Sequence, residues 1–163
     1  MTTSQFFTTA WNWNPVLLVL CAIAVAGYFV AFRLRGRPAY LAAALIIFLF
    51  ALVSPLSALA NGYLFSAHMI QHILFVLIVP ALLLLSLPAS VSLPRSLKTF
   101  SHPLIGWIAG IGAMWLWHAP GLCNAATRST TVSVIQTLSL LLMGSLFWWQ
   151  VLAPRDADRL SPA

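Results

Sequence analysis

Long apolar segments alternate with short polar connections along the chain. Each apolar segment holds most of the roughly 20 residues that a helix needs to cross a lipid bilayer, although the fourth is short. In lipid, each backbone N–H and C=O must be paired within its own segment, so these segments are predicted to be helices. The pattern predicts an all-α, polytopic transmembrane bundle of about five spans in one domain over residues 1–163. The expected spans are 15–32, 38–59, 63–87, 103–118 and 132–152.

Prolines mark the ends and the irregular points of these helices. Pro15, Pro38 and Pro103 stand at expected helix starts, where a missing N–H costs nothing. Pro55 and Pro80 lie inside expected spans and predict kinks. Such kinks are tolerated where a neighbouring helix or a water pairs the carbonyls that proline leaves free.

Composition and charge indicate that the chain is a membrane protein, and they limit the classes of partner that it is expected to bind. The chain has 163 residues, of which 61% are hydrophobic and only 6% charged, and its mean hydropathy is +0.96. So few charges cannot cover a water-facing surface. The net charge of +6 does not indicate nucleic-acid binding, because the basic residues lie in short loops between apolar segments. Membrane lipid is the expected surrounding, and nucleic acid is not an expected partner.

The basic residues also predict an orientation. Cytoplasmic loops of membrane proteins carry an excess of Lys and Arg. If the chain crosses the membrane five times, Arg128 is the only Lys or Arg on one side of the membrane, and the other basic residues lie on the opposite side. We therefore expect the N-terminus outside and the C-terminus in the cytoplasm, with Trp11 and Trp13 at the outer interface. The basic residues of the cytoplasmic side are Arg33, Arg35, Arg37, Arg95, Lys98, Arg155 and Arg159.

Three of the four histidines are expected to meet near the outer face. His68 and His72, in the stretch "HMIQH", are four residues apart and therefore share one face of a helix. The predicted threading brings His118, at the end of the fourth span, to the same leaflet, whereas His102 lies on the other side. Neutral imidazoles in such a cluster can bind a transition metal. His68, His72 and His118 are the candidate metal ligands.

Sulfur side chains nearby are weaker candidates. Met114 lies one turn from His118, and Cys123 is expected in the following loop. Thioether and thiol ligands favour Cu(I). Met69 is expected to lie nearly opposite the histidine face and not to bind. A disulfide between Cys21 and Cys123 is possible but not favoured.

The histidines also have other interpretations. They could form a hydrogen-bonded packing network, or His118 and one of the pair could bind a haem. The stretch "GWIAGIG" in the fourth span is more typical of close helix packing than of a porphyrin site. The chain has no Glu, and its two Asp lie in the C-terminal tail. It is therefore poorly equipped for catalysis, and we expect that it is not an enzyme.

Longer motifs carry a family resemblance. The stretch "ALVSPLSALANGYLFSAHMIQHILFVLIVPALLLLSLP" resembles the central signature of the CtaG-type cytochrome c oxidase assembly proteins, and "WLWHAP" and "GSLFWWQVLAP" resemble two later signatures in the right order. The resemblance covers roughly residues 40–160. It implies a multi-pass protein of the bacterial inner membrane that works with haem-copper oxidase subunits and assists copper delivery. His68, His72 and His118 match the family's histidines.

Two departures from the family pattern open a second interpretation. Ser133 and Thr137 stand where the family has a second histidine pair, and the family continues with two further helices after "LAP". The resemblance therefore implies a short or divergent member of the family, or a fragment of its usual fold. Such a protein could instead be a metal-free accessory subunit, bound stably to a respiratory oxidase.

Overall fold

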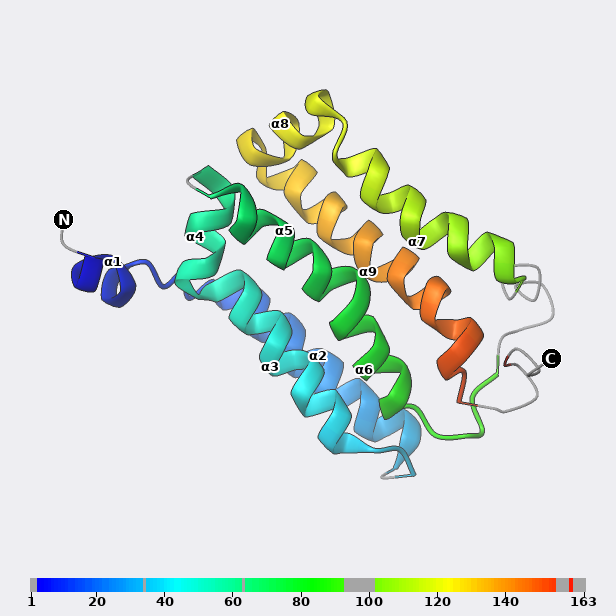
Figure 1. The fold of residues 1–163 in the computed structure, drawn as a ribbon. Coiled ribbons are helices and arrows are strands. Elements are labelled where there is room, and N and C mark those ends of the chain that lie inside the picture. Colours follow the sequence, from blue (N-terminus) through cyan, green and yellow to red (C-terminus); the bar gives the residue numbers. More distant parts are fainter. Residues whose placement is uncertain (1–2, 34, 63, 93–101, 155–158, 160–163) are drawn as a thin grey trace.

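The computed structural model describes the whole chain except residues 1–2, 34, 63, 93–101, 155–158 and 160–163. All regular structure in the described part is helical, as the apolar pattern predicts (Figure 1). The helices are α1 (Thr3–Thr9), α2 (Pro15–Phe32), α3 (Pro38–Val53), α4 (Pro55–Gly62), α5 (Phe65–Ile73), the π-helical segment η1 (Leu74–Ile78), α6 (Val79–Ser86), α7 (Pro103–Trp117), α8 (Pro120–Arg128) and α9 (Thr130–Leu152).

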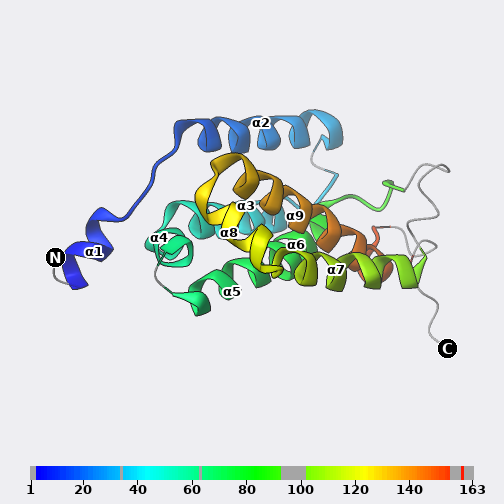
Figure 2. The same ribbon diagram turned by 90° about the horizontal axis from the view of Figure 1, so that it is seen from above.

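The helices α5, η1 and α6 form one continuous rod through the middle of the bundle (Figure 1). The helices α3 and α9 pack on this rod, and α7 packs on α9. The glycines of "GWIAGIG" allow that last contact: a Cβ on Gly106 would lie 2.9 Å from the Leu146 carbonyl, and one on Gly110 would lie 3.0 Å from Phe147. Helix α2 stands apart at one side of the bundle (Figure 2).

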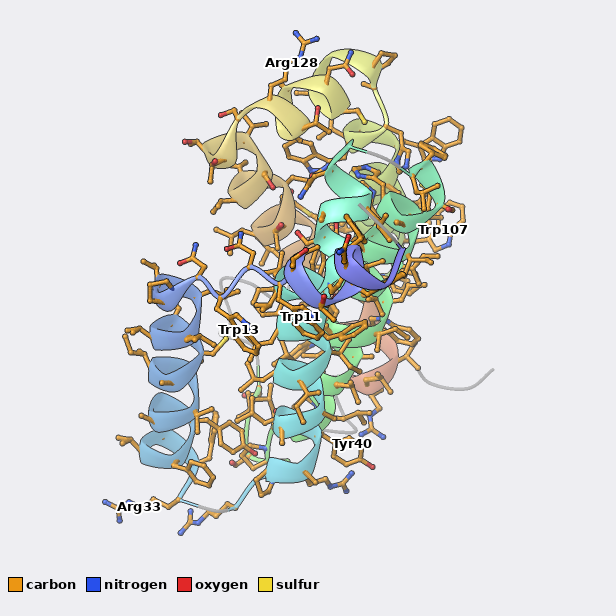
Figure 3. The ribbon with its side chains drawn as sticks, turned by 90° about the vertical axis from the view of Figure 1, so that its left-hand side faces the viewer. Trp11, Trp13, Arg33, Tyr40, Trp107 and Arg128 are labelled. Carbon is orange, nitrogen blue, oxygen red and sulfur yellow. The ribbon has the colours of Figure 1, made fainter. Side chains whose placement is uncertain are left out.

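Three helices in the described part are long and apolar enough to cross a membrane. They are Pro15–Phe32, the continuous rod Phe65–Ser86, and Thr130–Leu152. The bent pair α3 and α4 makes a fourth if the two helices are counted as one span, and α7 is a shorter apolar helix of 15 residues. Arg33 and Arg128 lie at opposite ends of the bundle (Figure 3). Arg95, Lys98 and Arg155, which contribute to the predicted orientation, lie outside the described residues. The fifth span and the orientation remain predictions.

The predicted kink at Pro55 is present, and a side chain from the central rod compensates for it. The helix axis bends by 53° between α3 and α4. Proline has no N–H to pair with the carbonyl four residues earlier, which is that of Ala51. The side chain of Gln71 donates to this carbonyl instead, with Nε2 2.6 Å from the oxygen. The glutamine of "HMIQH" therefore satisfies the backbone of a neighbouring helix.

Pro80 is accommodated differently, without a break in the rod. The helix widens into the π-helical segment η1, and the Val79 N–H donates to the Leu74 carbonyl. The carbonyl that Pro80 leaves free is that of Val76. Gly144 of α9 approaches this carbonyl so closely that a Cβ at that position would collide with it. The missing side chain of Gly144 allows α9 to pack against the irregular part of the rod.

Replacing Gln71 by leucine should cost about 1–3 kcal/mol of unfolding free energy, because the buried Ala51 carbonyl would lose its partner. The matched control is Gln136→Leu: the Nε2 of this buried glutamine has no hydrogen-bond partner in the described part of the chain. Pro55→Ala should rescue Gln71→Leu, because an alanine N–H can reach the same carbonyl. Reversible unfolding in mixed micelles measures the unfolding free energy of Gln71→Leu, Gln136→Leu, Pro55→Ala and the double variant Gln71→Leu/Pro55→Ala. An unchanged cost of Gln71→Leu in the Pro55→Ala background would contradict the assigned role.

Candidate metal centre

The structure brings His68, His72 and His118 together at the end of the bundle where α5 begins and α7 ends. Their ring centroids are 4.3 Å apart for His68 and His72, 5.1 Å for His72 and His118, and 6.3 Å for His68 and His118. The shared helix face positions the first two rings. The third follows the last turn of α7, where Trp117 Nε1 donates to Ser139 Oγ of α9 at 2.7 Å. The fourth histidine, His102, caps the other end of α7.

His72 is the central ring and the most deeply buried one. Its side chain is 2% exposed, and neither ring nitrogen has a hydrogen-bond partner within the described residues. His68 is 7% exposed; it bonds to the backbone of Ala60, but its Nε2 is without a partner in the same part of the chain. An unpaired buried polar atom costs roughly 1–3 kcal/mol. Three such nitrogens lie on two adjacent rings, and a metal ion bound at one nitrogen of each ring would satisfy two of them.

His118 directs one nitrogen toward a methionine. Its Nδ1 lies 2.5 Å from the Met114 carbonyl. A carbonyl only accepts, so Nδ1 carries the proton and Nε2 of the neutral ring presents a lone pair. This Nε2 lies 2.9 Å from Met69 Sδ, which is also an acceptor. Two lone pairs that suit a soft metal therefore face each other across the gap between α5 and α7.

The expectation that Met69 points away from the histidines is therefore wrong. With 3.6 residues per turn, Met69 lies only about 60° around the helix from His72. Its long, flexible side chain then reaches the ring of His118 on α7. Met69 is the residue of this cluster that was not predicted from the sequence, although its angle around the helix places it beside His72.

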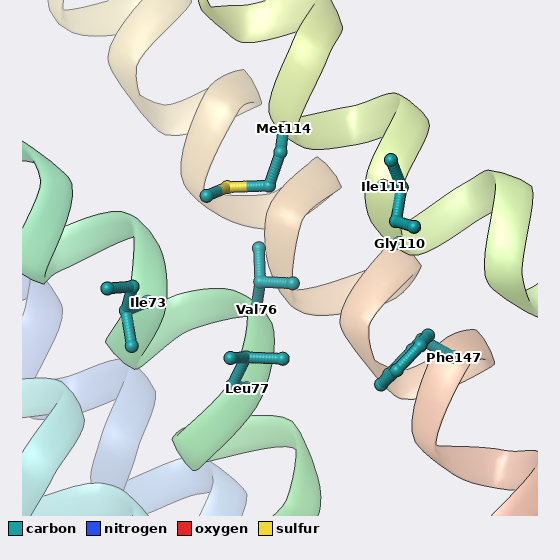
Figure 4. A pocket seen from close by; sticks show the side chains of 7 residues that line it. All are labelled: Ile73, Val76, Leu77, Gly110, Ile111, Met114 and Phe147. Atoms are coloured by element: carbon teal, nitrogen blue, oxygen red, sulfur yellow. The ribbon is translucent and has the colours of Figure 1, made fainter.

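The two sulfur residues named from the sequence have different positions. Met114 lines a surface depression of about 330 Å³ together with Met69, Trp115 and His118. It also borders an apolar crevice of about 160 Å³ between the rod, α7 and α9 (Figure 4). Cys123 lies on α8, and the prediction of a loop at this position is wrong; Pro120 is the first residue of this helix. Cys123 is a free thiol and does not line the depression, and Cys21 is also free.

Ser133 and Thr137 do not face the histidine cluster. They line a separate cavity of about 350 Å³ between α2, α3 and α9, which Cys21 also lines. The Thr137 hydroxyl donates to the Ser133 carbonyl at 3.0 Å. Histidines at these two positions would thus face a different cavity. Their absence therefore takes no ligand away from His68, His72 and His118.

The donor atoms are close together but do not form a finished coordination shell. Within the described residues, no group of three or more His, Cys, Asp or Glu side chains is already arranged to hold a metal ion. In a trigonal or tetrahedral site with metal–nitrogen bonds of about 2.0–2.1 Å, imidazole centroids are roughly 5–5.5 Å apart. The observed separations of 4.3, 5.1 and 6.3 Å lie around this value. The three rings are therefore spaced nearly as in a three-imidazole site, while their donor atoms do not converge on one point in the described part of the chain.

Comparisons with known proteins identify the family. No curated protein and no solved structure gave a significant match to the chain. A family model described as cytochrome c oxidase caa3 assembly factor (Caa3_CtaG) matches residues 21–163. This range contains all three clustered histidines and Met69, and the match confirms the resemblance carried by the longer motifs. The chain therefore belongs to the cytochrome c oxidase caa3 assembly factor family.

Proposed function

We propose that this chain binds Cu(I) through His68, His72 and His118 and assists its delivery to a haem-copper oxidase in the bacterial inner membrane, without itself catalysing a reaction. Membership of an oxidase assembly family supports the role in biogenesis. The observation that carries the metal proposal is His72, which is buried between two other imidazoles with both ring nitrogens unpaired in the described part of the chain.

The donor set fits copper in its lower oxidation state. Neutral imidazole and thioether are ligands that Cu(I) accepts. The cluster contains no carboxylate, and both of the chain's acidic residues lie in the tail sequence after α9. Because the cost of burying an ion rises steeply with its charge, a neutral cluster in an apolar site favours the monovalent ion over Cu(II). Met69 Sδ, beside His118 Nε2, would supply a fourth, soft donor.

Hydrogen bonds on the other side of two rings support the same proposal. Metal-binding histidines usually direct their second nitrogen to a carbonyl or carboxylate, which fixes the ring and its tautomer. His118 does this with the Met114 carbonyl, and His68 with the backbone of Ala60. A packing network among the side chains has less support, because Gln71 is already paired with Ala51.

The geometry gives little support to a haem. Two axial histidines must face each other across the plane of a porphyrin. His68 and His118 have centroids 6.3 Å apart, but the ring of His72 lies within 4.3 and 5.1 Å of them. A porphyrin between the outer two rings would have to pass through His72.

The proposed topology places the copper site at the outer face of the membrane. We propose five spans, with the N-terminus outside and the C-terminus in the cytoplasm. Helix α7, about 22 Å long for its 15 residues, would span with its flanking residues. The histidine cluster would then lie in the outer leaflet, where the open depression beside Met69 and Met114 gives copper an entry path.

Complementation of a strain that lacks this chain tests the function. Wild-type protein and His102→Ala should restore copper-loaded oxidase, whereas His72→Ala should restore less than about a tenth of it, because loss of one ligand from a small copper site has a large effect on affinity. Oxidase copper per haem measures the outcome. Full rescue by His72→Ala would contradict the proposal. Stable, stoichiometric co-purification with the oxidase in the absence of copper would establish the accessory-subunit alternative.

A further inference from the structure

At the opposite end of the rod from the histidines, arginines gather around a cavity of about 240 Å³. Arg35, Arg37 and Arg159 line it, together with apolar side chains that include Leu84 and Leu152. A second depression of about 280 Å³ adjoins it, lined by Arg33 and sharing Arg35 and Pro88 with the first. The cavity is therefore both basic and apolar, and it lies where the apolar helices end.

One backbone carbonyl at the end of α6 joins this helix to Tyr28 of α2 and to Arg37, just before α3. The Ser86 carbonyl, at the end of α6, accepts from the Tyr28 hydroxyl at 2.5 Å and from the Arg37 N–H at 2.9 Å. Gly36 packs directly on this junction, because a Cβ there would collide with the Tyr28 hydroxyl. Arg33 turns the chain at the end of α2 with a left-handed backbone (φ 42°). Arg37 is thus held through its backbone at the end of α6, and Arg33 lies at the end of α2.

The chain's own carboxylates are too few to balance this end of the molecule. Four arginines line the two depressions, and the whole sequence has only two acidic residues, Asp156 and Asp158, both outside the described residues. Arg159 Nε also donates to the Ala153 carbonyl at 2.8 Å. Even if both aspartates pair with arginines here, two of the four positive charges remain for an external anion. Guanidinium groups bind phosphate oxygens in pairs, which makes phosphate the matching chemistry.

We infer that this cavity binds the phosphate headgroup of an anionic phospholipid. The apolar part of the lining distinguishes an amphiphile from a free phosphate, because leucines at the cavity can contact the start of an acyl chain. Basic pockets between the ends of membrane helices bind lipid headgroups in this way. Arg35, common to both depressions, is the residue on which the site depends most.

Native mass spectrometry of the purified full chain tests this inference. The protein would be released from nanodiscs that contain phosphatidylglycerol, cardiolipin or phosphatidylcholine. We expect retention of an anionic lipid over phosphatidylcholine by roughly tenfold or more. The double variant Arg35→Gln/Arg37→Gln should lose this preference. Arg128→Gln, which removes the arginine at the other end, is the matched control and should keep it.

Three results would overturn the inference. Arg128→Gln could reduce retention as much as the double variant does, which would indicate a general charge effect. Inorganic phosphate at the same concentration could displace the lipid, which would indicate a simple anion site. The double variant could keep the full preference. Arg35→Lys/Arg37→Lys separates paired guanidinium contacts from charge alone, and circular dichroism checks that every variant retains its helices.

Discussion

Replacing His72 by alanine should lower the affinity of the protein for Cu(I) by at least about 100-fold, since removal of even an outer-shell partner costs 10–100-fold. His72 is the ring that contacts both of the others, with centroids 4.3 Å from His68 and 5.1 Å from His118. Without it, two imidazoles 6.3 Å apart remain. Competition with a chromophoric Cu(I) chelator measures the change in affinity.

The same chain provides a matched control. His102 lies at the other end of α7, where its Nδ1 accepts from the Leu104 N–H at 3.3 Å. His102→Ala should leave Cu(I) affinity unchanged. His72→Leu adds a second criterion: it should abolish copper binding but keep or raise the stability of the metal-free protein, because it removes two unpaired buried nitrogens. Equal loss of affinity in His72→Ala and His102→Ala would contradict the proposed ligand set.

Replacing Gly144 by alanine should destabilise the fold by about 3 kcal/mol or more, at the upper end of the range for overpacked cores. The added Cβ would collide with the Val76 carbonyl and would lie 2.9 Å from Pro80 Cγ. The carbonyl belongs to the backbone of the π-helical segment, so rotation of a side chain cannot relieve the contact. Unfolding free energy in mixed micelles measures the effect.

Gly112 on α7 is the control for this substitution. A Cβ at Gly112 meets nothing within 4 Å. Gly112→Ala should therefore be neutral or should stabilise the protein by up to about 1 kcal/mol, because alanine favours a helix. The two Gly→Ala changes thus have opposite expected signs. Similar stabilities for both variants would show that α9 does not pack on the rod as described.

The sequence predicted the helices well because their limits are set locally. Apolar length and proline fixed α2 at 15–32 and the start of α7 at residue 103. The kink at Pro55 followed from the missing N–H of proline. The donor that replaces this N–H could not be predicted from the sequence. Gln71 lies 20 residues from Ala51 along the chain, and only packing brings the two together. The close packing of α9 on η1 also depends on a residue far away in the sequence, Gly144.

The candidate site was predicted in outline and missed in detail. Helical spacing placed His68 and His72 on one face, and the threading of spans brought His118 to the same end. The position of Met69 was not predicted, although it lies only about 60° around the helix from His72 and its side chain reaches His118. Ser133 and Thr137 face α2, and the side to which they point depends on how α9 is rotated about its own axis. The sequence of a nearly uniform apolar helix does not reveal this rotation. The helix at 120–128 was hidden by its polar composition, which is typical of a loop.

X-ray absorption at the copper edge, on purified protein loaded with one equivalent of Cu(I), tests the central claim most directly. The proposal predicts imidazole nitrogens at about 2.0 Å and one sulfur at about 2.3 Å. The sulfur should disappear in Met69→Leu and remain in Met114→Leu. A spectrum without imidazole scattering, or one unchanged when His68 and His72 are both replaced by alanine, would contradict a copper site at these histidines.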